Sequence, residues 1–159
     1  MEFYLKDLSD AGQLAEFREF VQMRLNLRDT ECTLRIGAKP KGVADDFMPT
    51  ALYWRSELMR ETRITIRAVL DGNVTLHRLV VWTGCASRTF TDDVRVSCWM
   101  PQRLIGRERD EAFLALNGAM ACTDKEVAYG IARRDISDWL SGNLILGPEQ
   151  LRRRYRNSL

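Results

Sequence analysis

The chain has 159 residues, a formal net charge of +2, 45% hydrophobic residues and 29% charged residues. This balance is typical of one globular domain with a sizeable core, and it excludes a disordered tail or a histone-like binder that acts through net charge. No apolar run approaches the roughly 20 residues that cross a bilayer, so we expect no membrane partner.

The N-terminal part of the chain alternates short extended and helical patterns. Residues 3–5 and 33–36 predict short strands. Between them, Ser9 or Asp10 is a candidate N-cap, and apolar residues then recur at helical spacing over residues 14–25. We therefore expect a strand, an amphipathic helix and a second strand in that order.

A turn-rich segment follows, with two glycines and two prolines between residues 37 and 49. Such a composition predicts a surface loop. Thr50 is a candidate cap for a second helix, in which Trp54 and Leu58 are expected to face inward.

The middle of the chain carries the strongest turn signal. Asp71-Gly72-Asn73 separates two β-rich runs, residues 64–70 and 74–82, and this pattern predicts a hairpin. Arg78 breaks the alternation of the second run. A third β-rich run follows at residues 94–98, so we expect an α+β fold with an antiparallel meander of three to four strands, packed by the N-terminal helices.

Beyond Pro101 the pattern becomes helical. We expect residues 1–104 to form the mixed helix and antiparallel-sheet part, and residues 105–159 to form a helical C-terminal region. With no flexible linker between them, the two parts are expected to pack as one unit.

One C-terminal segment matches a recognition pattern at five positions: Gly130, Ile131, Ile136, Trp139 and Gly142. It resembles the turn and recognition helix of repressor-type helix-turn-helix domains. The resemblance implies that Arg133 and Arg134 face the major groove of DNA. The alternative is a helical hairpin with Trp139 in the core, which we favour because Glu126 stands where that family has a small residue.

Arginine supplies 20 of the 24 basic residues, and its planar fork suits phosphates and base edges. In the expected sheet, Arg67, Arg95 and Trp99 share the polar face. Such a face can bind single-stranded nucleic acid or a protein partner, and the alternative is an ordinary solvated face or one covered by the first helix. The basic run near the C-terminus is a further candidate. The expected binding residues are Arg67, Arg95, Trp99, Arg133, Arg134, Arg152, Arg153 and Arg154.

The sequence offers little for metal or catalytic chemistry. The four cysteines are widely spaced and His77 is the single histidine, so we expect no metal site, no cofactor and reduced thiols in the cytoplasm of a cell or host cell. No known catalytic motif occurs, and the chain is therefore expected not to be an enzyme.

Together these features predict a small accessory or regulatory protein of microbial or viral type that binds nucleic acid or a nucleoprotein complex. The alternative is a protein-interaction module, an inhibitor or an assembly subunit, which could act as a homo-oligomer.

Overall fold

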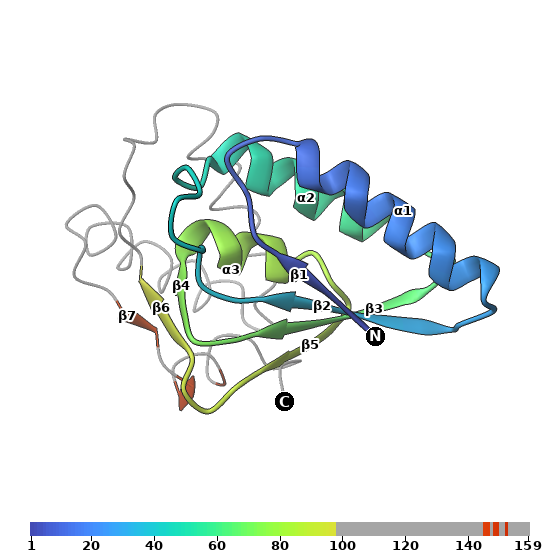
Figure 1. Cartoon of the computed structure of the whole chain (residues 1–159). Coiled ribbons are helices and arrows are strands. Elements are labelled where there is room, and N and C mark those ends of the chain that lie inside the picture. Colours follow the sequence, from blue (N-terminus) through green and yellow to red (C-terminus); the bar gives the residue numbers. More distant parts are fainter. Residues whose placement is uncertain (98–144, 147, 150–151, 153–159) are drawn as a thin grey trace, which may run out of the picture.

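The computed structural model describes residues 1–97, 145–146, 148–149 and 152. Its main sheet contains four parallel strands, and the fold is therefore α/β. In spatial order the strands are β1 (Glu2–Leu5), β2 (Glu31–Ile36), β3 (Thr65–Leu70) and β5 (Ser87–Phe90) (Figure 1).

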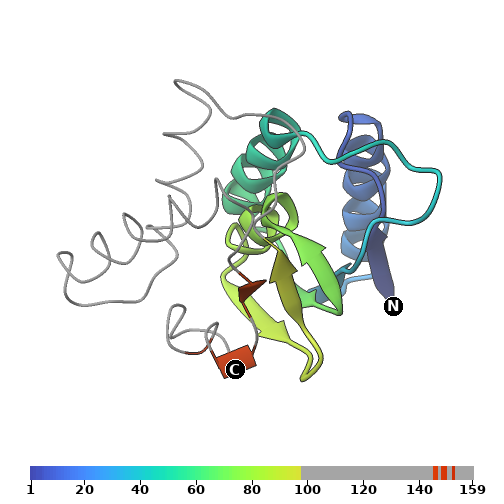
Figure 2. The same ribbon diagram turned by 90° about the vertical axis from the view of Figure 1, so that its left-hand side faces the viewer.

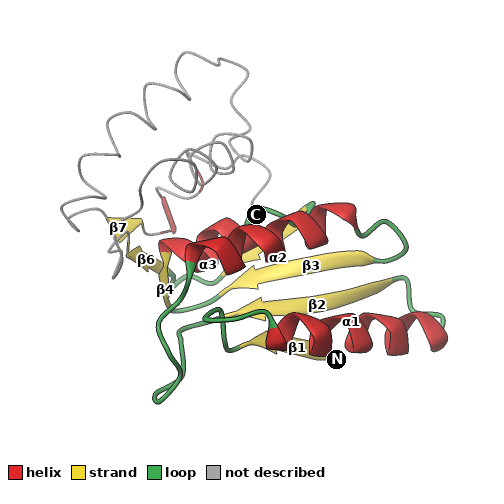
Figure 3. Ribbon diagram, turned by 90° about the horizontal axis from the view of Figure 1, so that it is seen from above, coloured by secondary structure: helices red, strands yellow, loops and turns green. Residues whose placement is uncertain are grey.

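Three helices cover one face of the main sheet: α1 (Gly12–Asn26), α2 (Met48–Arg60) and α3 (Leu76–Trp82) (Figure 3). Viewed from the carboxyl ends of the strands, α1 and α2 stand side by side, and α3 packs against α2 (Figure 2). Alternate strand residues such as Leu34 and Ala68 are buried under these helices. The opposite face of the described sheet carries exposed residues such as Glu31 and Arg67, and we call it the open face.

A second, smaller sheet lies beyond the carboxyl ends of the main strands (Figure 1). It contains β4 (Asn73–Thr75), β6 (Arg95–Ser97) and β7 (Ile145–Leu146); β4 and β6 are parallel, and β6 and β7 are antiparallel. Gly72 links β3 to β4 with a φ of 70°, which glycine adopts without strain. Its carbonyl accepts a hydrogen bond from the Arg95 amide at 2.9 Å.

The predicted α+β fold with an antiparallel meander is wrong, because β3 pairs in parallel with both β2 and β5. The turn at Asp71-Gly72-Asn73 exists, but it leads into the second sheet and not into a hairpin. Residues 76–82 form α3 where a strand was expected. All seven are buried, so no periodicity distinguishes a helix from a strand. The Thr75 side chain caps this helix by accepting a hydrogen bond from the Arg78 amide.

Several expectations for the N-terminal part are confirmed. The two short strands form, and Trp54 and Leu58 are buried. The helix starts differ: the N-cap of α1 is Ala11, and α2 begins at Met48, two residues before Thr50. The predicted boundary near residue 104 and the segment 130–142 lie outside the described residues.

Aromatic side chains fill the space between α1, α2 and β1. Phe17 lies 5.1 Å from Phe3 and 5.3 Å from Trp54, measured between ring centroids. Trp54 is fully buried. Within the described part of the chain, no helix has the length and hydropathy to cross a membrane.

Candidate functional site

A buried arginine joins the ends of β1 and β2 to α3. Arg78 is fully buried, and all five of its N–H groups donate hydrogen bonds. Three go to the carbonyl oxygens of Leu5 (2.8 Å), Lys6 (2.7 Å) and Gly37 (3.1 Å). The other two reach the two carboxylate oxygens of Asp46, both at 3.1 Å. Because of this fork, the Asp46 carboxylate has one fixed orientation.

A hydroxyl completes this arrangement. Thr75 Oγ1 donates a hydrogen bond to Asp46 Oδ2 at 2.6 Å. Asp46 is only 3% exposed, whereas Thr75 is half-buried. We call Asp46, Thr75 and Arg78 the Thr75 cluster. It lies at the carboxyl ends of the parallel strands, which is where open α/β sheets bind their ligands.

The single histidine, His77, is the second residue of α3 and follows Thr75 by two positions. The His77 side chain is almost fully buried, and its Nδ1 has no hydrogen-bond partner among the residues that the structure describes. Burial lowers the pKa of His77, and the nearby Asp46 carboxylate opposes this change. His77 is therefore a neutral imidazole at pH 7, a form that can accept a proton.

The Thr75 cluster has the geometry of an activated nucleophile: a hydroxyl within hydrogen-bond reach of a base that a third group orients. Thr75 supplies the hydroxyl, Asp46 the base and Arg78 the orienting group. No group of three metal-binding side chains occurs in the part of the chain that is described.

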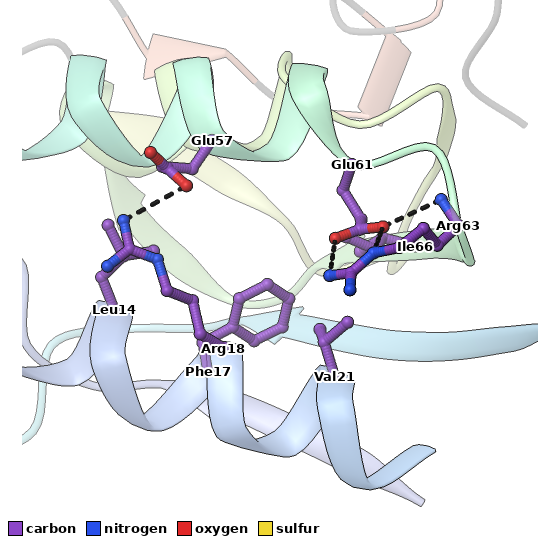
Figure 4. A pocket seen from close by; sticks show the side chains of 8 residues that line it. All are labelled: Leu14, Phe17, Arg18, Val21, Glu57, Glu61, Arg63 and Ile66. Carbon is purple, nitrogen blue, oxygen red and sulfur yellow. Dashed lines mark hydrogen bonds and ion pairs between the residues drawn. The ribbon is translucent and has the colours of Figure 1, made fainter. Parts of the chain in front are cut away.

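A small pocket lies between α1 and α2 (Figure 4). It has a volume of about 50 Å³, enough for a few water molecules at most. Arg18 and Glu57 form an ion pair across it at 3.2 Å, and Glu61 pairs with Arg63 at 2.9 Å. Its apolar lining is Leu14, Phe17, Val21 and Ile66. Since its charges are already paired, this groove offers less chemistry than the Thr75 cluster.

The structure does not bring Arg67 and Arg95, two of the predicted binding residues, onto one face. Arg67 lies on the open face of the main sheet, where it pairs with Glu31 at 3.2 Å. Arg95 is exposed on β6 in the second sheet. The two arginines therefore belong to different sheets, and the expected shared face does not exist.

Arg152 lies 3.8 Å from Asp92, and its guanidinium carbon is 5.4 Å from the ring centroid of Phe90. It is thus partnered by an acid and an aromatic ring. The remaining predicted binding residues lie outside the described part of the chain: Trp99, Arg133, Arg134, Arg153 and Arg154.

Sequence reasoning did not select the Thr75 cluster. The turn-rich composition of residues 37–49 predicts a loop position for Asp46, and the β-rich run of residues 74–82 predicts a strand position for Thr75. The one available signal was Arg78, which interrupts an otherwise apolar run. A charged residue inside a buried segment requires a partner of opposite charge, and Asp46 is that partner.

No family model matches the chain, and no curated protein matches it in sequence. Solved structures do match its fold. A structure described only as an enzyme superposes with a TM-score of 0.66 at 6% identity, over 99% of this chain and 94% of the other. A peptidase from Plasmodium falciparum gives a TM-score of 0.65 at 5% identity, with the same coverage.

A mutant of the 1510-N membrane-bound stomatin-specific protease matches with a TM-score of 0.62 at 6% identity, over 96% of this chain and 74% of the protease. At these identities the likeness establishes a shared fold. It also contradicts the expectation that the chain is not an enzyme, because the proteins that share its fold over most of their length include an enzyme, a peptidase and a protease. An enzyme needs no local sequence motif, since a fold can assemble a catalytic site from residues that are distant in the sequence.

Proposed function

We propose that the protein is a hydrolase of the peptidase kind, with the Thr75 cluster as its reaction centre. The observation that carries the proposal is the hydrogen bond of 2.6 Å from Thr75 Oγ1 to the oriented carboxylate of Asp46. The fold that the chain shares with a peptidase over nearly its whole length supports it.

In this reaction Thr75 Oγ1 attacks the carbonyl carbon of a peptide bond, and its proton passes to Asp46, which already accepts the hydrogen bond. When the C–N bond breaks, the proton leaves with the amine. Water then hydrolyses the resulting ester and restores the hydroxyl of Thr75. Arg78 holds Asp46 in place throughout, and it is therefore a positioning residue.

The test compares Thr75→Val with Thr75→Ser in an assay that follows the cleavage of fluorescently labelled casein. Valine removes the hydroxyl at nearly constant shape, so cleavage should fall at least about 100-fold, whereas serine retains a nucleophile. Thr65→Val, at an exposed position of β3, is the control and should cleave casein like the parent. A parent that cleaves no casein, or a Thr75→Val protein with full activity, contradicts the proposal.

Nucleic-acid binding and the protein-interaction alternative stay predictions. On the open face, Arg67 pairs with Glu31, and Arg35 pairs with both Glu2 and Asp71. Charge that is already neutralised by carboxylates attracts phosphate weakly. No contact in the described residues favours either partner class, so neither is put forward as a second function.

A further inference from the structure

Arg55 connects α2 to the end of α3. Its side chain is half-buried, and its Nε donates a hydrogen bond to Thr83 Oγ1 at 3.2 Å. The Thr83 hydroxyl in turn donates to the Val80 carbonyl at 2.6 Å. A Cβ atom at Gly84 would lie 2.9 Å from the carbonyl oxygen of Arg55. Glycine therefore permits a close approach that fixes the position of Arg55.

A second arginine contacts the residue before Thr83. Arg88, on β5, is buried, and its guanidinium carbon is 5.4 Å from the ring centroid of Trp82. Trp82 immediately precedes Thr83, so the two arginines contact consecutive residues at the end of α3. Burial lowers the pKa of Arg55, and the positive charge of Arg88 lowers it further. Both cations are thus shielded from water, Arg88 more than Arg55.

Arg55 differs from three other shielded arginines of the described chain. Arg24 pairs with Asp29, Arg35 with Glu2, and Arg78 with Asp46. Among the described residues, Arg55 has a hydroxyl partner and no carboxylate. A guanidinium that is shielded from water and next to a like charge is stabilised by an oxyanion that accepts its remaining N–H groups.

We propose that Arg55, together with Arg88, binds the carboxylate group of a ligand at the end of α3. Arginine has five N–H donors, so each side chain can bind the carboxylate in addition to the contacts it already makes. The site is separate from the Thr75 cluster, since Thr83 follows the last residue of α3 and Thr75 precedes the first. Its existence does not depend on the proposed hydrolysis.

The carboxylate could belong to a small organic acid or to the C-terminus of a peptide, and the experiment separates these sources. The side-chain Nε–H signal of Arg55 is followed by NMR during titration with acetate, with a tripeptide that has a free C-terminus, and with the same tripeptide amidated. We expect a saturable shift with acetate or with the free peptide. Acetate alone would indicate a small acid, and preference for the free peptide over the amide would indicate a chain terminus.

Variants of Arg55 test whether its guanidinium binds the carboxylate. Arg55→Met should weaken carboxylate binding at least tenfold, as followed on the Nε–H signal of Arg88, and Arg55→Lys should weaken it less because the charge remains. Arg95→Met is the matched control, since Arg95 is exposed and donates to the Val94 carbonyl. No saturable shift with either probe in the parent, or equal binding by the parent and a folded Arg55→Met protein, overturns the proposal.

Discussion

The Thr75 cluster and the open face of the main sheet each contain an arginine–carboxylate pair of nearly the same length. Arg78 lies 3.1 Å from Asp46, and Arg67 lies 3.2 Å from Glu31. The side chains of the first pair are 0% and 1% exposed, whereas those of the second are 50% and 57% exposed. We therefore expect solvent exposure, and not pair distance, to determine what each ion pair contributes to stability, because water screens the exposed pair and does not reach the buried one.

The largest expected effect is at Arg78. Arg78→Met should lower the free energy of unfolding by about 3–5 kcal/mol, because it leaves the buried Asp46 side chain and three buried carbonyl groups without their hydrogen-bond donor. Urea denaturation measures this. The double variant Arg78→Met with Asp46→Leu should be less destabilised than the single variant, since no buried charge is then left. A loss below about 1 kcal/mol in the single variant would mean that water reaches the Thr75 cluster.

Packed and open positions of the backbone should also differ in how well they accept a side chain. Gly84→Ala should destabilise by about 1–3 kcal/mol, because the new Cβ would lie 2.9 Å from a backbone oxygen of α2. Gly37→Ala is the matched control, with its nearest contact at 3.8 Å and a φ outside the left-handed region. Thermal denaturation of both variants tests this. Equal melting temperatures would show that α2 and α3 separate at little cost.

Protonation of the buried His77 should change the free energy of unfolding more than protonation of the exposed groups on the open face. The pKa of His77 is lower in the folded protein than in the unfolded chain, where it is about 6.5. The unfolded state therefore binds the proton more readily. The contribution of His77 to the stability is therefore complete above about pH 6.5. It is lost as the pH falls from about 6.5 toward the pKa of His77 in the folded protein, by at most about 1.4 kcal/mol per pH unit.

The unfolding free energy at pH 7 and pH 5.5 measures this dependence, and His77→Gln should remove it. His77 is the only histidine in the sequence, so no other imidazole can produce the same slope. A slope that persists in the variant would assign the dependence to carboxyl groups.

The smallest expected effect is on the open face. Arg67→Ala should change the unfolding free energy by less than about 1 kcal/mol, because both partners of this pair are at least half exposed. Adding salt should reduce the difference further. Urea denaturation at low and high salt measures both effects, and a loss as large as that of Arg78→Met would refute the comparison.

The parts of the fold that the sequence could predict have a local cause. The helical spacing that includes Leu14, Phe17 and Val21 marks α1 because only one side of that helix is buried. The same reasoning failed at α3, which is buried on every side and therefore carries no periodic pattern. Strand order was equally inaccessible, since the parallel pairing of β3 with β2 and β5 depends on helices that cross over between them.

The site was harder to predict than the fold. Asp46 and Thr75 are ordinary loop and strand-end residues when considered separately, and 29 positions separate them. Only Arg78 was anomalous in its local context. That anomaly correctly signals a buried partner, but the sequence alone does not identify which of the many acids fills that role.

Arg78 also constrains the order of folding events. Its hydrogen bonds to Leu5 and Lys6 join groups 73 and 72 positions apart, so they close one of the longest loops among the described contacts. During synthesis, more than seventy residues must be added after β1 before Arg78 is present to donate to these carbonyl groups. Contacts of such separation form slowly. The amides at the end of β1 should therefore become protected from hydrogen exchange only after α3 has joined the sheet.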